Sequence, residues 1–478
     1  MNLIKENKKN NFIFFYILAL TGIILAVIVI FLNIGKGSID LRDEALTACR
    51  SLYIYHHHNI FNIKVAEHIS IRKPPFVYIL TAISYILFGI NELGLRIPNA
   101  FFGVAIFILI TLASLKSSKK VGWLAPFILL GCFNLIRVSR EALTDTSFIF
   151  FISLTFLSLY LDLLDNTDKH QNLYLFLYFL GICFGLLSKG PLTLLAFFYI
   201  LLFLYFVKRN RVLFKKYLVI GIIATIPFLI WSIVQYIYYP HFFDIYFGQE
   251  YLDRLNYHAK FLPQFIRGPF YYITNYWRWF RLSGVVTILL IFLIFYLYRY
   301  KKLNWNRDKF LSFLYINGAW LLYLIVASIA SHKSRRYILP IFPLLTIVFV
   351  IGIDGLLEVY SNNRIVKYLI YFISLVCMVV GFQALYKHYQ KVPDYLPIRK
   401  EIAIKIKPYK KWEIYTNDWH IAPILEFYLD KEDIKVVKKI PPLTKKTIIV
   451  KGKEKRAQDN ERREFIIISK QFRWTFKE

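Results

Sequence analysis

Cysteine is scarce in this chain, and its spacing is not that of a metal site. The 478 residues include 4 cysteines, none of them in a Cys-x-x-Cys pair. Cys132, Cys183 and Cys377 lie inside apolar runs, where a thiol packs as a small hydrophobic group. The sequence therefore predicts neither a metal-binding cysteine cluster nor a disulfide framework.

Acidic residues are half as frequent as basic ones, with 30 Asp and Glu against 60 Lys and Arg, so the net charge is +30 at pH 7. Such an excess could indicate nucleic-acid binding. Here, however, the basic residues lie between long apolar runs, where they orient membrane helices and meet anionic lipid headgroups. We therefore expect membrane lipids, and no nucleic acid, as their partners. Glycine-rich nucleotide-binding motifs are absent from the sequence as well.

Apolar residues are abundant: 57% are hydrophobic, 18% aromatic and only 19% charged, and the mean hydropathy is +0.47. This composition is typical of an integral membrane protein, in which a span needs roughly 20 apolar residues. We predict an all-α polytopic fold with about eleven spans. They are 11–33, 95–115, 121–138, 146–164, 172–188, 190–207, 217–238, 282–299, 310–331, 336–357 and 365–387. The first has no small-residue cleavage site, so we expect it to be retained.

The apolar run 75–89 is a special case, because its length of about 22 Å as a helix is short of the ~30 Å of hydrocarbon. If it does not cross, nearly all the later Lys/Arg-rich loops fall on the cytoplasmic side, as the positive-inside rule requires. We therefore predict an interfacial helix on the outer leaflet. The outer face then carries residues 34–94, the turn 140–145, the loop 239–281 and the turn 331–337.

The tail from about residue 390 has a different pattern. Alternating stretches such as "WEIYTND", "KTIIVKGK" and "EFIIISK" are typical of β-strands. We predict a membrane domain over 1–389 and a small extracytoplasmic α/β domain over 390–478.

Three carboxylates lie at predicted outer ends of spans. Asp43 and Glu44 form an acidic pair in the first outer loop, and an acidic pair beside a cavity is a candidate general base. Asp145 directly precedes an apolar span in "REALTDTSFIFF". The alternative readings are a solvated helix start for the pair and a helix N-cap for Asp145.

Basic residues lie on the same predicted outer face as these carboxylates. Lys73 precedes Pro74-Pro75 and a helix start, where a phosphate could meet both the ammonium and the helix dipole; a snorkelling lysine is the alternative. The third outer loop is rich in aromatic residues and contains Glu250, Arg254 and His258. The last outer turn, "SHKSRRYILP", adds Lys333 and Arg336. Positive charge on the non-cytoplasmic side is exceptional, and an anionic partner such as a phosphate would explain it.

These residues together predict a pocket at the outer leaflet that binds a lipid-linked phosphate. Displacement of a phosphate leaving group needs cations for the developing charge and a base for the attacking hydroxyl. The lack of a nucleotide motif fits a donor that is carried by a lipid.

Several motifs extend over nearly the whole chain in one order. They are "RDEALTACR", "RKPPFVYILTAISYILFGINELGLRIPNAFFG", "SREALTDTSFIFF", "LLSKGPLTLL", "EYLDRLNYHAKFLPQFIRGPFYY", "KSRRYILPIFP" and "IAPILEFYLDKEDIKVVKK". They resemble the superfamily of dolichyl-phosphate-mannose-protein mannosyltransferases and bacterial aminoarabinose (lipid A) transferases, which are C-type glycosyltransferases that use polyprenyl-phosphate sugars.

The resemblance implies roles for individual residues. Asp43 matches the proposed catalytic base, Glu44 completes the acidic pair, and Asp145 matches a second outer carboxylate. Lys73 and Arg254 match cations around the lipid phosphate. Lys333 and Tyr337 belong to the motif that closes the same site.

Two positions depart from the aminoarabinose branch. There, a Glu before Lys-Pro-Pro and a His after the Glu of the third outer loop are implicated in a metal site. Arg72 and Tyr251 stand at these positions here. We therefore expect no metal and no other cofactor, and we assign Tyr251 with Glu250 and His258 to the acceptor or the sugar.

The resemblance implies an inverting membrane glycosyltransferase, with a polyprenyl-phosphate sugar as donor and a lipid A-like lipid, a glycan or a protein as acceptor. We expect a monomer in a bacterial inner membrane, with its active site outside the cytoplasm. A lipid or solute transporter is the alternative, but the spans lack the mid-span charges and the inverted repeat expected of one. A glycan-binding scaffold without activity is a third possibility, in which the carboxylates would be dispensable.

Overall fold

The protein, described here from a computed structural model, forms two compact units. The first contains residues 1–32, 99–140 and 144–390, and the second contains residues 33–98, 141–143 and 391–478. The described residues are 2–39, 42–66, 68–165, 168–252, 271–272, 284–300, 302–303, 305–330, 333–360, single positions between 363 and 383, 398–437, 441–444, 446–454, 463–469, 471 and 473–477.

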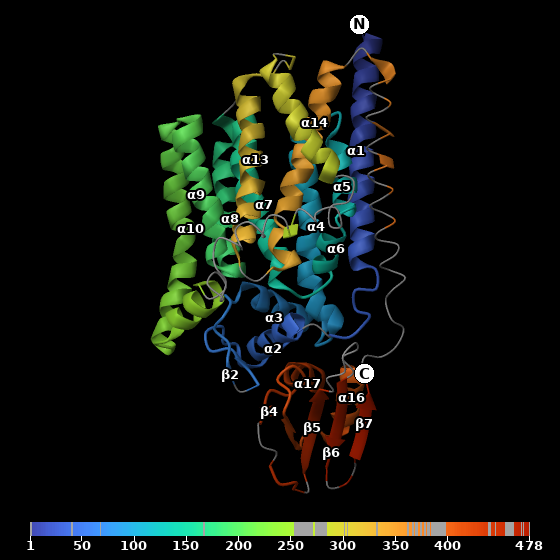
Figure 1. The fold of residues 1–478 in the computed structure, drawn as a ribbon, viewed down its shortest axis with the longest axis vertical. Helices are drawn as coiled ribbons and strands as arrows, with labels where there is room; N and C mark the ends of the chain where they lie inside the picture. The colour runs from blue at the N-terminus through green and yellow to red at the C-terminus, as the bar shows by residue number, and fades with distance from the viewer. Residues whose placement is uncertain are drawn as a thin grey trace. The chain divides into compact units, whose positions relative to one another are not determined.

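Apolar helices that run alongside one another build the first unit (Figure 1). Among the described residues, eight helical segments are long and apolar enough to cross a membrane. They are α1 (Asn2–Phe31), α4 (Glu92–Ser117), α7 (Thr144–Leu164), α8 (Gln171–Lys189), α9 (Leu194–Leu202) with the turns on either side of it, α10 (Arg211–Tyr238), α13 (Arg307–Ile329) and α14 (Ile341–Val359). This confirms the predicted polytopic membrane fold.

The outer surfaces of these helices explain why a bilayer is needed. On α10, Ile222, Ile230 and Ile233 are each more than half exposed, and α1 exposes a similar set of large aliphatic side chains. In water such a continuous apolar surface would be unfavourable, whereas lipid chains solvate it. By contrast, α7 and α14 are mostly buried inside the unit.

Three predicted spans differ from the description. The run 121–138 is bent by 75° between the segment Gly122–Leu130, which includes α5 (Ala125–Leu130), and α6 (Phe133–Ser139). The break falls at Cys132, whose ψ of 74° is not helical. The run 282–299 corresponds to a shorter helix, Gly284–Arg299. The run 365–387 lies largely outside the described residues.

The run 75–89 forms a helix too short to span, as predicted. α3 (Phe76–Phe88) has 13 residues, about 20 Å at 1.5 Å per residue, and lies in the second unit. It begins directly after Pro74-Pro75, and it ends at Gly89, whose φ of +80° is accessible to glycine at little cost. Its position at the outer leaflet stays a prediction.

The second unit combines the first loop with the tail of the chain. The loop contributes α2 (Arg42–His57), the short antiparallel strands β1 (Lys64–Val65) and β2 (His68–Ile69), and α3. The tail contributes the helices α16 (Ile398–Ile406) and α17 (Ala422–Leu429) and the strands β3 (Glu413–Thr416), β4 (Lys435–Val436), β5 (Thr447–Glu454), β6 (Arg463–Ile468) and β7 (Arg473–Lys477). The predicted α/β character of the tail is therefore confirmed, while the domain boundary at 389/390 stays a prediction.

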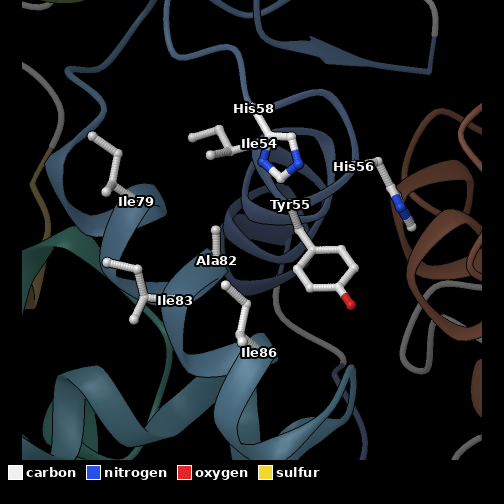
Figure 2. Close-up of a pocket in the computed structure, with 8 residues that line it drawn as sticks. All are labelled: Ile54, Tyr55, His56, His58, Ile79, Ala82, Ile83 and Ile86. Carbon is white, nitrogen blue, oxygen red and sulfur yellow. The ribbon is translucent and has the colours of Figure 1, made fainter.

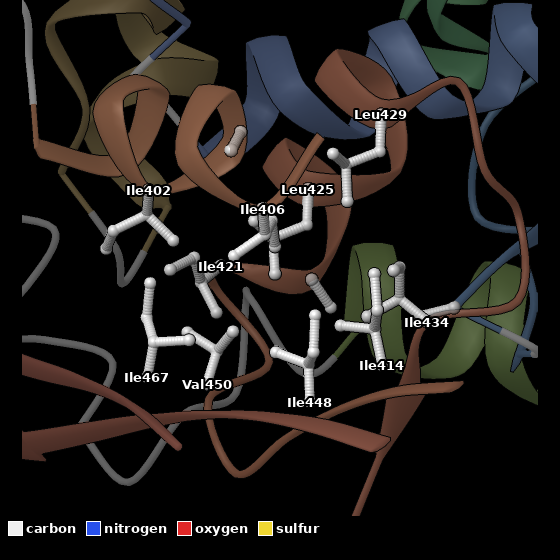
Figure 3. Packing of buried hydrophobic residues seen from close by; sticks show 13 residues of the cluster. Ile402, Ile406, Ile414, Ile421, Leu425, Leu429, Ile434, Ile448, Val450 and Ile467 are labelled. Carbon is white, nitrogen blue, oxygen red and sulfur yellow. The ribbon is translucent and has the colours of Figure 1, made fainter. Parts of the chain in front are cut away.

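The five tail strands form one sheet in the order β4-β3-β5-β6-β7. β3 pairs in parallel with β4 and β5, and the remaining pairs are antiparallel. Figure 3 shows the aliphatic side chains of α16 and α17 pointing toward those of the strands. Ile406, Leu425, Ile414 and Ile448 are all 0% exposed, so this is a closed core.

Helix α17 is buried on two sides. Leu425 and Leu429 contact the core over the sheet, whereas Ile424 and Phe427 pack against α2. Polar contacts accompany this packing: the Cys49 Sγ donates to the Pro423 carbonyl oxygen at 2.9 Å. Helix α17 therefore links the core over the sheet with the separate cluster around α2.

Candidate active site

The predicted acidic pair lies in the first turn of α2. Glu44 is only 2% exposed, and both of its oxygens accept hydrogen bonds from the Arg96 guanidinium, at 2.8 Å from Nε and 3.1 Å from Nη2. The Ala142 N–H donates to the same carboxylate at 3.1 Å. Asp43, its neighbour, is half-buried. The geometry therefore favours a positioning role for Glu44 and leaves Asp43 as the more accessible carboxylate of the pair.

Arg96 also fixes the segment that leads into α2. Its two terminal nitrogens donate to three backbone carbonyl oxygens at 3.0–3.1 Å, those of Ile34, Lys36 and Ser38. A guanidinium can make this many contacts because it presents five N–H donors in a rigid plane. The pair Glu44–Arg96 thus joins the start of α4 to the start of α2, where Asp43 lies. Sequence reasoning did not identify Arg96, although it lies in the quoted motif "LRIP".

Lys73 belongs to the same compact unit as Asp43. It is half-buried and stands in the loop immediately before α3, followed by the buried prolines Pro74 and Pro75. A residue before proline is confined to extended backbone conformations, and the proline ring fixes the next φ. The ammonium therefore starts from a backbone with little freedom.

The third carboxylate, Asp145, lies in the first turn of α7 in the other unit. Its side chain is 8% exposed and makes an ion pair of 2.5 Å with Lys189 Nζ and a longer one of 3.5 Å with Arg336 Nη1. Lys189 also lies over the Phe148 ring, 5.2 Å from its centroid. Two cations therefore face one carboxylate, and this group of three side chains carries a net charge of +1.

Lys189 is a residue that sequence reasoning missed. It is the last residue of α8 and is followed by Gly190, which has a φ of +79°. The signal was present in "LLSKGPLTLL", where a lysine interrupts an apolar run directly before Gly-Pro. A lone lysine at a span end is usually a snorkelling residue, and only the fold pairs it with Asp145.

Lys333 and Tyr337 both belong to the turn before α14, where a short 3₁₀ helix covers Arg335–Ile338. Lys333 Nζ donates to the carbonyl oxygens of Ser328 and Ala330 at 2.5 and 2.6 Å, so it caps the C-terminus of α13. Its burial lowers the pKa of the Lys333 ammonium below the ordinary lysine value. An ammonium has three donors, and among the described residues these contacts use two of them.

The remaining predicted residues belong to the third outer loop. Arg254 and His258 lie outside the described residues. Glu250 and Tyr251 fall in the helical segment Asp244–Leu252, and their side chains are outside the description. Their roles stay predictions.

A cavity of about 540 Å³ lies between α2 and α3 (Figure 2). It is lined by Ile54, Tyr55, His56, His58, Ile79, Ala82, Ile83 and Ile86. None of the predicted site residues is among them, so the site argument does not depend on this cavity.

The fold of the chain is similar to that of solved membrane proteins with the C-type glycosyltransferase fold. Crystal structures of ArnT from Cupriavidus metallidurans have this fold, with a TM-score of 0.67 for the form bound to undecaprenyl phosphate and 0.65 for the apo form. Both are 16% identical in sequence; the matches cover 88% and 86% of this chain and 86% and 84% of those chains.

Sequence comparison points to the same superfamily. Residues 72–231 match the family model described as dolichyl-phosphate-mannose-protein mannosyltransferase. A protein of Aquifex aeolicus (strain VF5), described as uncharacterized, is 27% identical over 335 residues. That match covers 68% of this chain and 62% of the relative, which is less than two thirds of its length. These matches confirm the resemblance to the superfamily expected from the motifs, that of the mannosyltransferases and aminoarabinose transferases with the C-type fold.

Proposed function

We propose that this protein is a membrane glycosyltransferase that moves a sugar from a polyprenyl-phosphate donor to an acceptor outside the cytoplasm. The C-type fold and the family match support this class of reaction. The proposed acceptor is a lipid A-like lipid, a glycan or a protein, and the proposed location is a bacterial inner membrane. ArnT was crystallised with undecaprenyl phosphate, which supports a lipid-phosphate donor here as well.

The observation that carries the proposal is the fixed acidic pair on α2. Glu44 is held by Arg96 and by the Ala142 N–H, so its position is set by two segments distant from α2 in sequence. Asp43 is covalently adjacent and is oriented by the same helix turn. A general base must be held in a fixed position to accept a proton from an attacking hydroxyl, and this arrangement supplies that rigidity.

The cations are assigned to the phosphate. Lys73, Arg254, Lys333, Arg336 and Tyr337 are proposed to hold the phosphate group of the donor. The net positive charge around Asp145 supports the assignment of Arg336, because Lys189 already compensates that carboxylate.

The proposed reaction is a single displacement. The acceptor oxygen attacks the anomeric carbon of the sugar and forms the new C–O bond, while the bond from that carbon to the phosphate oxygen breaks. The proton of the acceptor hydroxyl goes to the Asp43 carboxylate, and the electron pair leaves with the polyprenyl phosphate. Attack opposite to the leaving group inverts the configuration. Glu250, Tyr251 and His258 are proposed to contact the sugar or the acceptor.

The decisive experiment is Asp43→Asn in the full chain, reconstituted in lipid with a panel of polyprenyl-phosphate sugars. We expect a loss of transfer of at least about 10²–10³-fold, the usual contribution of a general base. Asp433→Asn, which removes an exposed carboxylate of the same unit, is the matched control and should retain activity. Transfer by the folded Asp43 variant at the control rate would refute the assignment.

The substrates require a separate measurement. Mass spectrometry of envelope glycolipids and glycoproteins, from cells with and without the gene, should show one added sugar that depends on the gene. Movement of a polyprenyl-phosphate sugar across vesicles without transfer would favour the transporter instead.

A further inference from the structure

A buried arginine lies next to the segment that carries Lys73. Arg50 is in the third turn of α2, seven residues after Asp43, so at 3.6 residues per turn both project from nearly the same side of the helix. The Arg50 side chain is 7% exposed. Among the residues of the second unit whose burial the structure describes, Arg96 is the other buried arginine.

Two hydroxyl groups accept hydrogen bonds from the Arg50 guanidinium. Arg50 Nε donates to Ser70 Oγ at 2.6 Å, and Nη1 donates to the Tyr78 hydroxyl at 2.7 Å. The guanidinium carbon also lies 5.1 Å from the centroid of the Tyr78 ring. Ser70 stands three residues before Lys73 and Tyr78 stands five residues after it. One rigid group therefore holds the chain on both sides of Lys73.

The charge of Arg50 is not explained by an acid. Among the described residues its hydrogen-bond partners are the two neutral hydroxyls, and no carboxylate forms an ion pair with it. Arg96, in contrast, has a carboxylate and three carbonyl oxygens. Burial of an uncompensated cation costs free energy. A neutral side chain could link the same two hydroxyl groups at a lower cost, so a purely structural role does not explain the charge.

The local backbone makes such a tie effective. Lys73 precedes two prolines, so its φ and ψ have few alternatives, and Tyr78 is in the first turns of α3. With Ser70 and Tyr78 fixed, the backbone between them cannot shift without breaking a hydrogen bond to a charged donor, worth about 1.5–3 kcal/mol.

We propose that Arg50 is a positioning residue for donor binding: by holding Ser70 and Tyr78 it fixes Lys73 toward the phosphate of the polyprenyl-phosphate donor. This inference rests on the proposed function. It gives a role to a residue of the motif "RDEALTACR" to which neither the motif nor the resemblance assigned one.

The test measures binding of a polyprenyl phosphate to the full chain in lipid nanodiscs. Lys73→Ala should weaken binding by about 10-fold or more, as expected for the loss of a charged contact to a phosphate. Arg50→Gln should weaken it by a similar factor, and Arg50→Lys, which keeps the charge but loses the planar fork, should lie between Arg50→Gln and the wild type. Ser70→Ala and Tyr78→Phe should each give a smaller loss. Arg473→Gln, an exposed arginine of β7, is the control.

The double variant distinguishes a positioning role from a structural one. If Arg50 acts through Lys73, Arg50→Gln should have almost no further effect on binding in the Lys73→Ala background. Equal losses in both backgrounds, or wild-type affinity of a folded Arg50→Gln protein, would overturn the proposal. If Arg50→Gln does not fold, the same comparison is made with Ser70→Ala and Tyr78→Phe. Wild-type affinity of Lys73→Ala would instead refute the proposed function of Lys73.

Discussion

Two buried carboxylates in this protein are neutralised in different ways. Both oxygens of Glu44 accept hydrogen bonds from the Arg96 guanidinium, so the charges of these two side chains cancel. Asp145 has a lysine at 2.5 Å and an arginine at 3.5 Å, so its group has an excess of one positive charge. The comparison indicates that the first pair holds the fold in place, whereas the three side chains of the second group sum to a net charge of +1.

The largest effect is expected from breaking the balanced pair. Glu44→Ala would leave the Arg96 guanidinium buried without its counterion, a loss of about 3–5 kcal/mol in the free energy of unfolding. Glu413→Ala is the control, because its ion pair with Lys435 is long, at 3.8 Å, and exposed. Thermal unfolding of the two variants in detergent should show a much larger drop in Tm for Glu44→Ala. Equal shifts would contradict a structural role for the pair.

A smaller effect is expected from removing the excess charge. In Lys189→Gln the ion pair with Asp145 would be lost, and the summed charge of the three side chains would fall from +1 to zero. Binding of polyprenyl phosphate should weaken by about 10-fold, which corresponds to ~1.4 kcal/mol. The control is Lys208→Gln, which breaks a lysine–aspartate pair of the same length with Asp308. If both variants bind alike, the charge around Asp145 does not serve the donor.

The smallest effect sharpens the comparison with a third buried carboxylate, for which no ion pair is found among the described residues. Glu426 on α17 is 2% exposed and accepts the Ala66 N–H at 2.9 Å, and burial raises its pKa to about 8. Because the folded state binds the proton more tightly than the unfolded state, Glu426 should destabilise the fold progressively as the pH rises from about 4.5 to about 8.

Glu426→Gln keeps the shape of the side chain and removes its charge. The Tm of this variant should therefore fall less than that of the wild type between pH 5 and pH 8, measured under the same buffer and detergent conditions. A wild-type Tm that stays level or rises over this interval, with the variant parallel to it, would contradict the assignment of a protonated Glu426.

Much of the fold follows from local sequence. The spans were recognisable because roughly 20 apolar residues in a row have few alternatives to a membrane helix. α3 was recognisable as too short, and the tail strands from their alternation. The bend at Cys132 was not predicted, because the run around it is apolar throughout and hydropathy does not report a backbone break.

The site was predictable only in part. Asp43, Glu44, Asp145 and Lys73 stand out because charges are rare near apolar runs. Their partners do not, since Arg96 lies 52 residues from Glu44 and Lys189 lies 44 residues from Asp145. Such pairs depend on tertiary packing, which no local pattern encodes. For the same reason the closed environment of Glu44 could not be told apart from that of Asp43 beforehand.

The two-sided burial of α17 has a consequence for the whole chain. A nonsense mutation or a proteolytic cut near residue 397 would remove the helix against which Ala48, Cys49 and Leu52 of α2 pack. The membrane helices could still insert, but α2 would lose its packing contacts with α17. The position of Asp43 on α2 would then be less rigidly fixed. The last eighty residues should therefore tolerate shortening far less than their place at the end of the chain suggests.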